Sequence, residues 1–355
     1  PLLVLAGAGS GKTKALTHRI AYLIKEKNIS PYRILAVTFT NKAAREMSDR
    51  VEHLLGNNQD TITKIQTTGG IRLPWMGTFH SICVKILRQE AHHLGYERNF
   101  TIYDSGDQLS IIKRIMKDLG INPKDFAPKS VQYFISGAKN ELIDSKEYKK
   151  YSNSPFENVT GRVFERYEKY LKDTNGMDFD DLIMQCVKLF QENPKVLGKY
   201  QDQFKYILID EYQDTNQAQY LWAKLLAEKH KNIMVVGDDF QSIYSWRGAN
   251  FRNILNFEKK YPNAKVIKLE QNYRSTKTII AAADEVIKYN KQRTDKTLWT
   301  ENKEGLPITV YKALNEKDEA EFVCTEIKSL LNRHSEFITR YDSKKLKALK
   351  DCSCL

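Results

Sequence analysis

The sequence has few of the features that mark secreted, disulfide-bonded or membrane-spanning proteins. Its 355 residues include five cysteines, and no two of them have the CxxC spacing of a zinc or redox motif. It contains no run of about 18 consecutive apolar residues, the length that a membrane-spanning helix needs. We therefore expect reduced thiols, a cytoplasmic location and no membrane partner.

The sequence has fewer acidic residues than basic residues. The chain has 44 aspartates and glutamates against 56 lysines and arginines, and its formal net charge is +12. This balance suits a polyanionic partner such as nucleic acid, although many basic proteins bind none. Hydrophobic residues make up 41% and charged residues 28%, which is ordinary for globular proteins and excludes a wholly disordered chain or a collagen-like rod. At about 150 residues per domain, the length allows two or three domains.

Short apolar runs alternate with helical patterns, which predicts an α/β fold with a parallel sheet covered by helices. The expected strands are 2–5, 33–38, 206–209, 233–236 and 264–269, and the expected helices include 12–27, 41–55, 216–229 and 277–289. Residues 56–75 are predicted as a loop. From about Ser81 to Gln191 long amphipathic helices dominate, which indicates an inserted helical domain. A strand at 308–311 and a helix at 316–331 would begin a further α/β unit.

The segment AGAGSGKT at 6–13 follows an expected strand and opens an expected helix, the context of a phosphate-binding loop. Small residues let backbone N–H groups close around phosphates, and the helix N-terminus adds partial positive charge. Lys12 would reach the β- and γ-phosphates of ATP, and the Thr13 hydroxyl would ligate Mg²⁺. Ala6 stands where the strict pattern has glycine, and the alternative is a glycine-rich turn with a chance lysine. The candidate ATP-binding residues are Ala6, Gly7, Ala8, Gly9, Ser10, Gly11, Lys12 and Thr13.

An acidic pair follows another apolar strand. Residues 207–209 would form the buried strand, and Asp210 would stand at its carboxyl end, where ligands bind in open α/β sheets. We expect Asp210 to hold Mg²⁺ and Glu211 to act as the general base that activates the attacking water. The alternative is that both carboxylates only cap a strand that faces solvent.

Together with further segments, these motifs resemble the UvrD/PcrA/Rep group of superfamily 1 DNA helicases, from residue 1 to about residue 330. The matching blocks, in the family's order, are AGAGSGKT at 6–13, AVTFTNKAAREM at 36–47, GTFHSIC at 77–83, DEYQDTNQAQY at 210–220, VVGDDFQSIYSWRGA at 235–249 and LEQNYRS at 269–275. MDFDDLI at 177–183 is a further familiar stretch. The resemblance implies ATP hydrolysis coupled to 3′ to 5′ movement on single-stranded DNA, in a bacterial, nucleoid-associated enzyme of repair or replication.

The same resemblance implies a domain plan. A P-loop NTPase domain of the RecA-like kind would comprise 1–85 and 184–262, interrupted by a helical insert at 86–183. A second RecA-like domain would begin at 263 and extend to 355, with an atypical tail at 337–355. Duplex/single-strand junctions and proteins of repair or replication would be the partners.

Three further residues take ATP-site roles from the resemblance. Gln241 resembles the glutamine that senses the γ-phosphate, Arg274 would act as an arginine finger on it, and Tyr273 would stack on the adenine. A structural salt bridge is the alternative for Arg274. Phe240 stands where many relatives carry an aspartate, a change that we expect to retune coupling without abolishing the chemistry.

Aromatic residues next to a basic residue suggest where DNA binds. Tyr244 and Trp246 stand two apart with Arg247 next, which suits a platform where bases stack at about 1–3 kcal/mol each. The alternative is that Tyr244 and Trp246 are core residues on one face of a strand. Thr40 and Asn41 would cap a helix and meet a phosphate, although capping alone would explain them. The other candidates for DNA contact are Phe39, Phe79 and His80, with a buried histidine as the alternative for the last.

The family's adenine-reading glutamine block and the later blocks of its second motor domain have no counterpart in the sequence. We therefore expect an N-terminal fragment that binds Mg²⁺-ATP weakly and does little unwinding alone, because such motors work by closing a cleft between two domains. Two alternatives stay open. The parent protein would be a helicase–nuclease subunit of the AddA or RecB kind, or the chain would be a truncated ATP- and DNA-binding module without motor activity.

Overall fold

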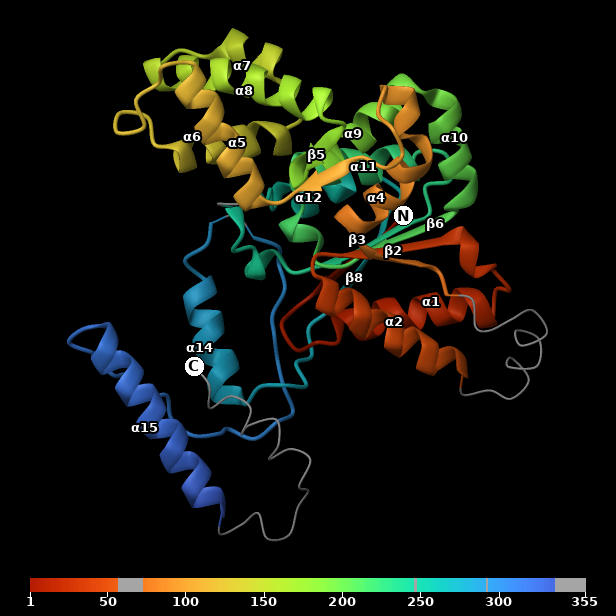
Figure 1. The fold of residues 1–355 in the computed structure, drawn as a ribbon. Coiled ribbons are helices and arrows are strands. Elements are labelled where there is room, and N and C mark those ends of the chain that lie inside the picture. The colour runs from red at the N-terminus through yellow and green to blue at the C-terminus, as the bar shows by residue number, and fades with distance from the viewer. Residues whose placement is uncertain (57–72, 246–247, 292, 336–355) are drawn as a thin grey trace. The chain divides into compact units, whose positions relative to one another are not determined.

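The computed structural model describes residues 1–56, 73–245, 248–291 and 293–335, and it divides the chain into two units, Pro1–Gly305 and Leu306–Leu355 (Figure 1). In the second unit the described structure includes one long helix, α15 (Glu316–Ser335). No helix in the described parts of the chain is long and apolar enough to cross a membrane.

The first unit is built on a six-stranded sheet whose neighbouring strands all run parallel, in the order β3-β2-β6-β7-β1-β8. The strands are β1 (Leu2–Ala6), β2 (Ile34–Thr38), β3 (Trp75–Thr78), β6 (Tyr206–Ile209), β7 (Ile233–Gly237) and β8 (Lys265–Leu269). A separate parallel pair joins β4 (Thr101–Tyr103) to β5 (Gly176–Asp178). The predicted α/β fold with a parallel sheet is confirmed.

Helices follow the strands in the alternating order that the sequence predicts. In the described part of the first unit the α-helices are α1 (Lys12–Lys25), α2 (Asn41–Gly56), α4 (Phe79–Glu90), α5 (Ser105–Asp118), α6 (Pro128–Asn140), α7 (Ser145–Tyr151), α8 (Pro155–Asp173), α9 (Phe179–Glu192), α10 (Pro194–Gln203), α11 (Gln217–Ala227), α12 (Arg252–Leu255), α13 (Phe257–Lys260) and α14 (Lys277–Ile287). Short 3₁₀ turns are η1 (Pro31–Arg33), η2 (Ala91–Leu94), η3 (Tyr212–Asp214) and η4 (Asp239–Gln241).

The sheet is buried on both faces. Leu3 and Leu5 of β1 enter a core shared with α4, α9 and α11, whereas Val4 and Ala6 enter a core shared with α1 and α2. Period-two alternation sends successive side chains to opposite faces, and both faces are covered. This is why the central strands are continuous apolar runs in the sequence.

Helices α5, α6 and α8 pack around a core of their own, with α7 alongside α8 (Figure 1). Its fully buried members include Ile112, Val131, Ile135, Phe164 and Tyr167. This helical core covers less of the chain than the predicted insert at 86–183, because α4 and α9 pack in the core of the sheet.

Three local expectations differ from the structure. Strand β3 begins inside the segment predicted as a loop, of which residues 57–72 lie outside the described part. Strand β8, which we predicted to open the second domain, instead completes the first sheet by pairing with β1. Residues 308–311 form no strand, and no strand in the described part of the second unit is available to pair with them.

Candidate functional site

The loop that joins β1 to α1, here called the 6–13 loop, has the backbone of a phosphate cradle. Gly9 and Gly11 adopt left-handed conformations with φ of 68° and 91°. A Cβ at Gly9 would come within 2.7 Å of the Arg274 Cβ and 2.9 Å of the Asn272 amide nitrogen, so there is no room for a side chain. Gly11 at the N-cap has no side chain to cap α1, which leaves the first helical N–H groups available to an anion.

Side chains from three strand ends meet beside this loop. Lys12 Nζ donates to Glu211 Oε2 at 2.9 Å and to Gln241 Oε1 at 3.4 Å. Thr13 Oγ1 donates to Asp210 Oδ2 at 3.2 Å. The residues follow β1, β6 and β7, which are neighbours in the sheet. The fold thereby brings together five candidate residues that are up to 229 positions apart in the sequence.

The acidic pair occupies an environment that disfavours two negative charges. Burial, and then the charge of Glu211, raise the pKa of Asp210 to about 6, although Lys12 and Thr13 act to lower it. Glu211 itself has a left-handed φ of 52°, a backbone conformation that is unfavourable for residues other than glycine. The Thr13 hydroxyl and the Asp210 carboxylate form a donor set of the kind that Mg²⁺ prefers, and they fit a magnesium site next to the loop.

The segment after β8 packs against the 6–13 loop. Asn272 Nδ2 donates to the carbonyl oxygen of Ala8 at 2.6 Å, and the Tyr273 N–H donates to that of Gly9 at 3.0 Å. Asn272 Oδ1 accepts from the Arg274 N–H at 2.8 Å. One buried amide thus fixes both the loop and the backbone of Arg274. We did not single out Asn272 from the sequence, although it stands inside the LEQNYRS block. The Tyr273 side chain is 67% exposed.

A cavity of about 800 Å³ lies between the sheet's carboxyl edge and α6. Five of the residues predicted to contact DNA line it: Phe39, Thr40, Phe79, His80 and Tyr244. Tyr133 and Phe134 of α6 line the same cavity and were not singled out from the sequence, although two adjacent aromatics on an amphipathic helix were a visible signal.

The predicted DNA residues differ in how much of their surface is free. Phe79 is 1% exposed and packs edge-on against Phe39 and Trp222, with ring centroids 6.0 and 5.7 Å apart. Burial lowers the pKa of His80. Thr40 Oγ1 accepts from the Ala43 N–H at 3.1 Å and so caps α2. Asn41 is the exposed first residue of α2 and does not line the cavity. Trp246 and Arg247 lie outside the described residues.

Comparison with known proteins identifies the family. The description "UvrD/REP helicase N-terminal domain" matches residues 1–262, and "UvrD-like helicase C-terminal domain" matches residues 267–346. This chain belongs to the UvrD/REP helicase family. The ATP-dependent DNA helicase PcrA of Bacillus subtilis is 54% identical over 330 residues, which cover 93% of this chain and 43% of that protein. The PcrA proteins of Staphylococcus epidermidis and Staphylococcus aureus are 53% identical over 327 residues, with 92% and 43% covered.

The chain spans less than half the length of the UvrD/REP relatives that it matches. The matched region nevertheless contains the 6–13 loop, the acidic pair and the 235–249 and 269–275 segments, which meet in one place. The residue Phe240, unusual among UvrD/REP proteins by our expectation, lies under the Lys296 ammonium, with Nζ 3.7 Å from the ring centroid. Lys296 also bonds Asp238 and Asp239 at 2.5 Å.

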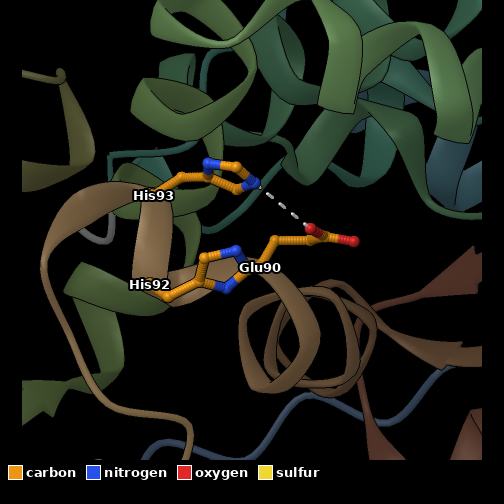
Figure 2. A group of neighbouring side chains, drawn as sticks. All are labelled: Glu90, His92 and His93. Atoms are coloured by element: carbon orange, nitrogen blue, oxygen red, sulfur yellow. Dashed lines mark ion pairs between the residues drawn. The ribbon is translucent and has the colours of Figure 1, made fainter.

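A second group of possible metal ligands lies away from this site in the UvrD/REP chain. Glu90, His92 and His93 place one ligand atom each within 4.8 Å of one another, and His93 Nε2 is 3.7 Å from Glu90 Oε2 (Figure 2). The other Glu90 oxygen, however, bonds Lys199 Nζ at 2.5 Å. Burial raises the pKa of Glu90, but Lys199, Tyr200 and His93 lower it on balance. The carboxylate is therefore already paired, and it ties α4 to α10.

Proposed function

We propose that this chain binds Mg²⁺-ATP and single-stranded DNA, and that it is the nucleotide-binding part of an ATP-dependent, 3′ to 5′ DNA helicase. The observation that carries the proposal is the meeting of Lys12, Thr13, Asp210, Glu211 and Gln241 at one edge of the parallel sheet. Ligands bind at this edge in open α/β folds. The names of the relatives support both ATP and DNA as ligands.

The chemistry assigned to the site is in-line attack of water on the ATP γ-phosphate. A bond forms from the water oxygen to phosphorus, the bond to the β,γ-bridging oxygen breaks, and Glu211 accepts a water proton. Thr13 and Asp210 would hold Mg²⁺, which neutralises phosphate charge when bound. The backbone of the 6–13 loop and Lys12 would bind the β- and γ-phosphates. Gln241 and Arg274 would respond to the γ-phosphate, and Tyr273 would stack on the adenine.

Single-stranded DNA would occupy the cavity beside α6, with bases stacked on Tyr244 and Phe39. The exposed hydroxyl of Thr40 would meet a phosphate next to the N-terminus of α2. Trp246, Arg247, Phe79 and His80 keep their proposed places in this DNA site. Duplex/single-strand junctions in repair or replication remain the proposed substrates, and the cytoplasm is the proposed location because bacterial chromosomes lie there.

Nucleotide binding tests the first half of the proposal. Lys12→Ala should weaken the binding of a fluorescent ATP analogue with Mg²⁺ at least tenfold, because it removes the ammonium at the centre of the site. Lys14→Ala is the matched control, since Lys14 is an exposed lysine two residues further along the same helix. Glu211→Gln should retain analogue binding and lose hydrolysis in the longest form of the protein. If all three variants bind the ATP analogue with the affinity of the wild type, the proposed nucleotide site is refuted.

A further inference from the structure

Gln213 is bonded at both ends of its side-chain amide and is 1% exposed. Its Nε2 donates to Glu211 Oε2 at 2.9 Å and to Asp214 Oδ2 at 3.2 Å. Its Oε1 accepts from the Asp238 N–H at 2.9 Å. The amide therefore connects the acidic segment after β6 with the segment after β7 that leads to Gln241.

The neighbouring backbone leaves space for this amide. A Cβ at Gly237, the last residue of β7, would come within 2.6 Å of Gln213 Oε1. Asp238 follows directly and accepts a hydrogen bond from Gln241 Nε2. One hydrogen bond thus connects Gln213 to Glu211, and two hydrogen bonds connect it through Asp238 to Gln241.

Asp214 carries the connection to the cavity. It lies at the end of η3 and lines the 800 Å³ cavity together with Tyr244 and Thr40. Asp214 Oδ1 is buried and has no hydrogen-bond partner among the described residues. Burial and the charge of Glu211 raise the pKa of Asp214 to about 6, against Lys12 and Gln213. A buried, half-satisfied carboxylate is sensitive to any charge that enters the cavity.

We propose that Gln213 is a positioning residue that couples the DNA cavity to the ATP site. It holds the Glu211 carboxylate in place, and through Asp214 it makes that place depend on whether the cavity is occupied. This inference rests on the proposed function, since it takes the cavity as the DNA site and Glu211 as the base. Gln213 touches neither ligand, and its effect passes through Glu211 and Asp214.

The physical reason is electrostatic. A nucleic-acid backbone in the cavity adds negative potential near the Asp214 carboxylate, in surroundings where charge is weakly screened. The Asp214 oxygen that bonds Gln213 then moves or binds more strongly, and the amide shifts with it. Because the same Nε2 also bonds Glu211, this shift reaches the carboxylate that faces Lys12. Lys12 is the residue proposed to bind the β- and γ-phosphates.

The test measures thermodynamic coupling in the 355-residue chain. The affinity for a fluorescent oligo(dT) would be determined with and without a non-hydrolysable ATP analogue and Mg²⁺. In the wild type we expect the two constants to differ at least fivefold, and the analogue affinity to change by the same factor when DNA is added. Gln213→Ala should bring this factor to within twofold of one. The affinity for oligo(dT) alone and the affinity for the analogue alone should each stay within threefold of the wild-type value. If Gln213 had only a structural role, its loss would instead lower these affinities.

Gln201→Ala is the matched control, because its amide bonds the Leu225 carbonyl at 2.8 Å away from both sites. It should keep the wild-type coupling factor. Where Gln213→Ala does not fold, Gln213→Met replaces it, since methionine fills a similar space, adds no charge and cannot donate to Glu211 and Asp214. The proposal is overturned if the variant keeps the coupling factor of the wild type. It is also overturned if the wild type itself has a coupling factor of one. Failure of the wild type to bind either ligand would instead refute the proposed function.

Discussion

At the scale of single residues, the 6–13 loop depends on positions where a side chain cannot stand. Gly9 is constrained twice, by its left-handed φ of 68° and by contact with the segment after β8. The second constraint joins parts of the chain that are more than 260 positions apart, as the Asn272–Ala8 bond shows. The same close approach places Arg274 against the loop.

Gly9→Ala should therefore damage the site more than a glycine substitution elsewhere. We expect a loss of about 1–3 kcal/mol in the free energy of unfolding, because the backbone is left-handed and the added methyl collides with Asn272 and Arg274. Affinity for an ATP analogue should fall at least tenfold. Urea unfolding and analogue titration measure the two effects.

Gly198→Ala is the matched control for Gly9→Ala. Gly198 lies inside α10, and a Cβ there would meet nothing within 4 Å. Alanine should raise the free energy of unfolding by about 0.5–1 kcal/mol, because it favours the helix. If the two substitutions have equal effects, the crowding at Gly9 does not determine the fold of the loop.

At the scale of elements, a buried ion cluster joins α6 to β5 and α9. Lys139, which is fully buried, bonds Asp178 and Asp181 at 2.8 Å each, and the Tyr167 hydroxyl donates to Asp178. Burial raises the pKa of Asp181 to about 7, with Asp178 adding to the effect and Lys139 opposing it. Burial also acts to raise the pKa of Asp178, but Lys139 lowers it on balance. The helix that lines the cavity is thereby anchored to the core of the sheet.

Lys139→Met should destabilise the first unit by about 3–5 kcal/mol, because it leaves two buried carboxylates without their cation. The pKa of both carboxyls then rises in the folded state, which binds more protons than the unfolded chain. The free energy of unfolding should consequently fall as the pH rises, so the loss is larger at pH 8 than at pH 6. Urea unfolding at the two pH values measures this difference.

Lys129→Met on the exposed first turn of α6 is the control, and it should change the free energy of unfolding by less than about 0.5 kcal/mol. A Lys139→Met variant that lost the same stability at both pH values would show that lost packing, and not uncompensated charge, is responsible.

At the scale of the whole molecule, the net charge of +12 and the aromatic cavity suggest two separable contributions to DNA binding. Basic side chains would release counterions from the phosphates, which makes the affinity depend on salt. Stacking on Tyr244 would add affinity that depends little on salt. The two contributions can be distinguished because they respond to different variables.

The logarithm of the affinity for oligo(dT) should fall linearly with the logarithm of the salt concentration, by about 0.7 for each neutralised phosphate. Tyr244→Ala should lower the affinity by about 1–3 kcal/mol at every salt concentration and leave this slope unchanged. Tyr289→Ala, at an 88% exposed position after α14, is the control and should change neither quantity. Anisotropy titrations at several salt concentrations measure both the affinity and the slope. A changed slope in Tyr244→Ala would contradict a stacking role.

The parallel α/β fold and its central strands can be predicted from the amino-acid sequence alone. Period-two burial on both faces makes β1, β2, β6 and β7 short apolar runs, and the glycines and Lys12 of the 6–13 loop depend mainly on local backbone conformation. The Asp210–Glu211 pair was visible for the same reason, since it follows an apolar strand directly.

Which distant residues meet depends instead on how the strands and helices pack. Strand β8 belongs to the first sheet because its register with β1 aligns Lys265–Leu269 with Leu2–Ala6, a choice that local propensity does not encode. Asn272 meets the 6–13 loop, and Gln213 bridges Glu211 to Asp214 and Asp238, through bonds that depend on strand order. Hydrogen bonds between such segments follow from packing, because their partners become neighbours only when the whole sheet has formed.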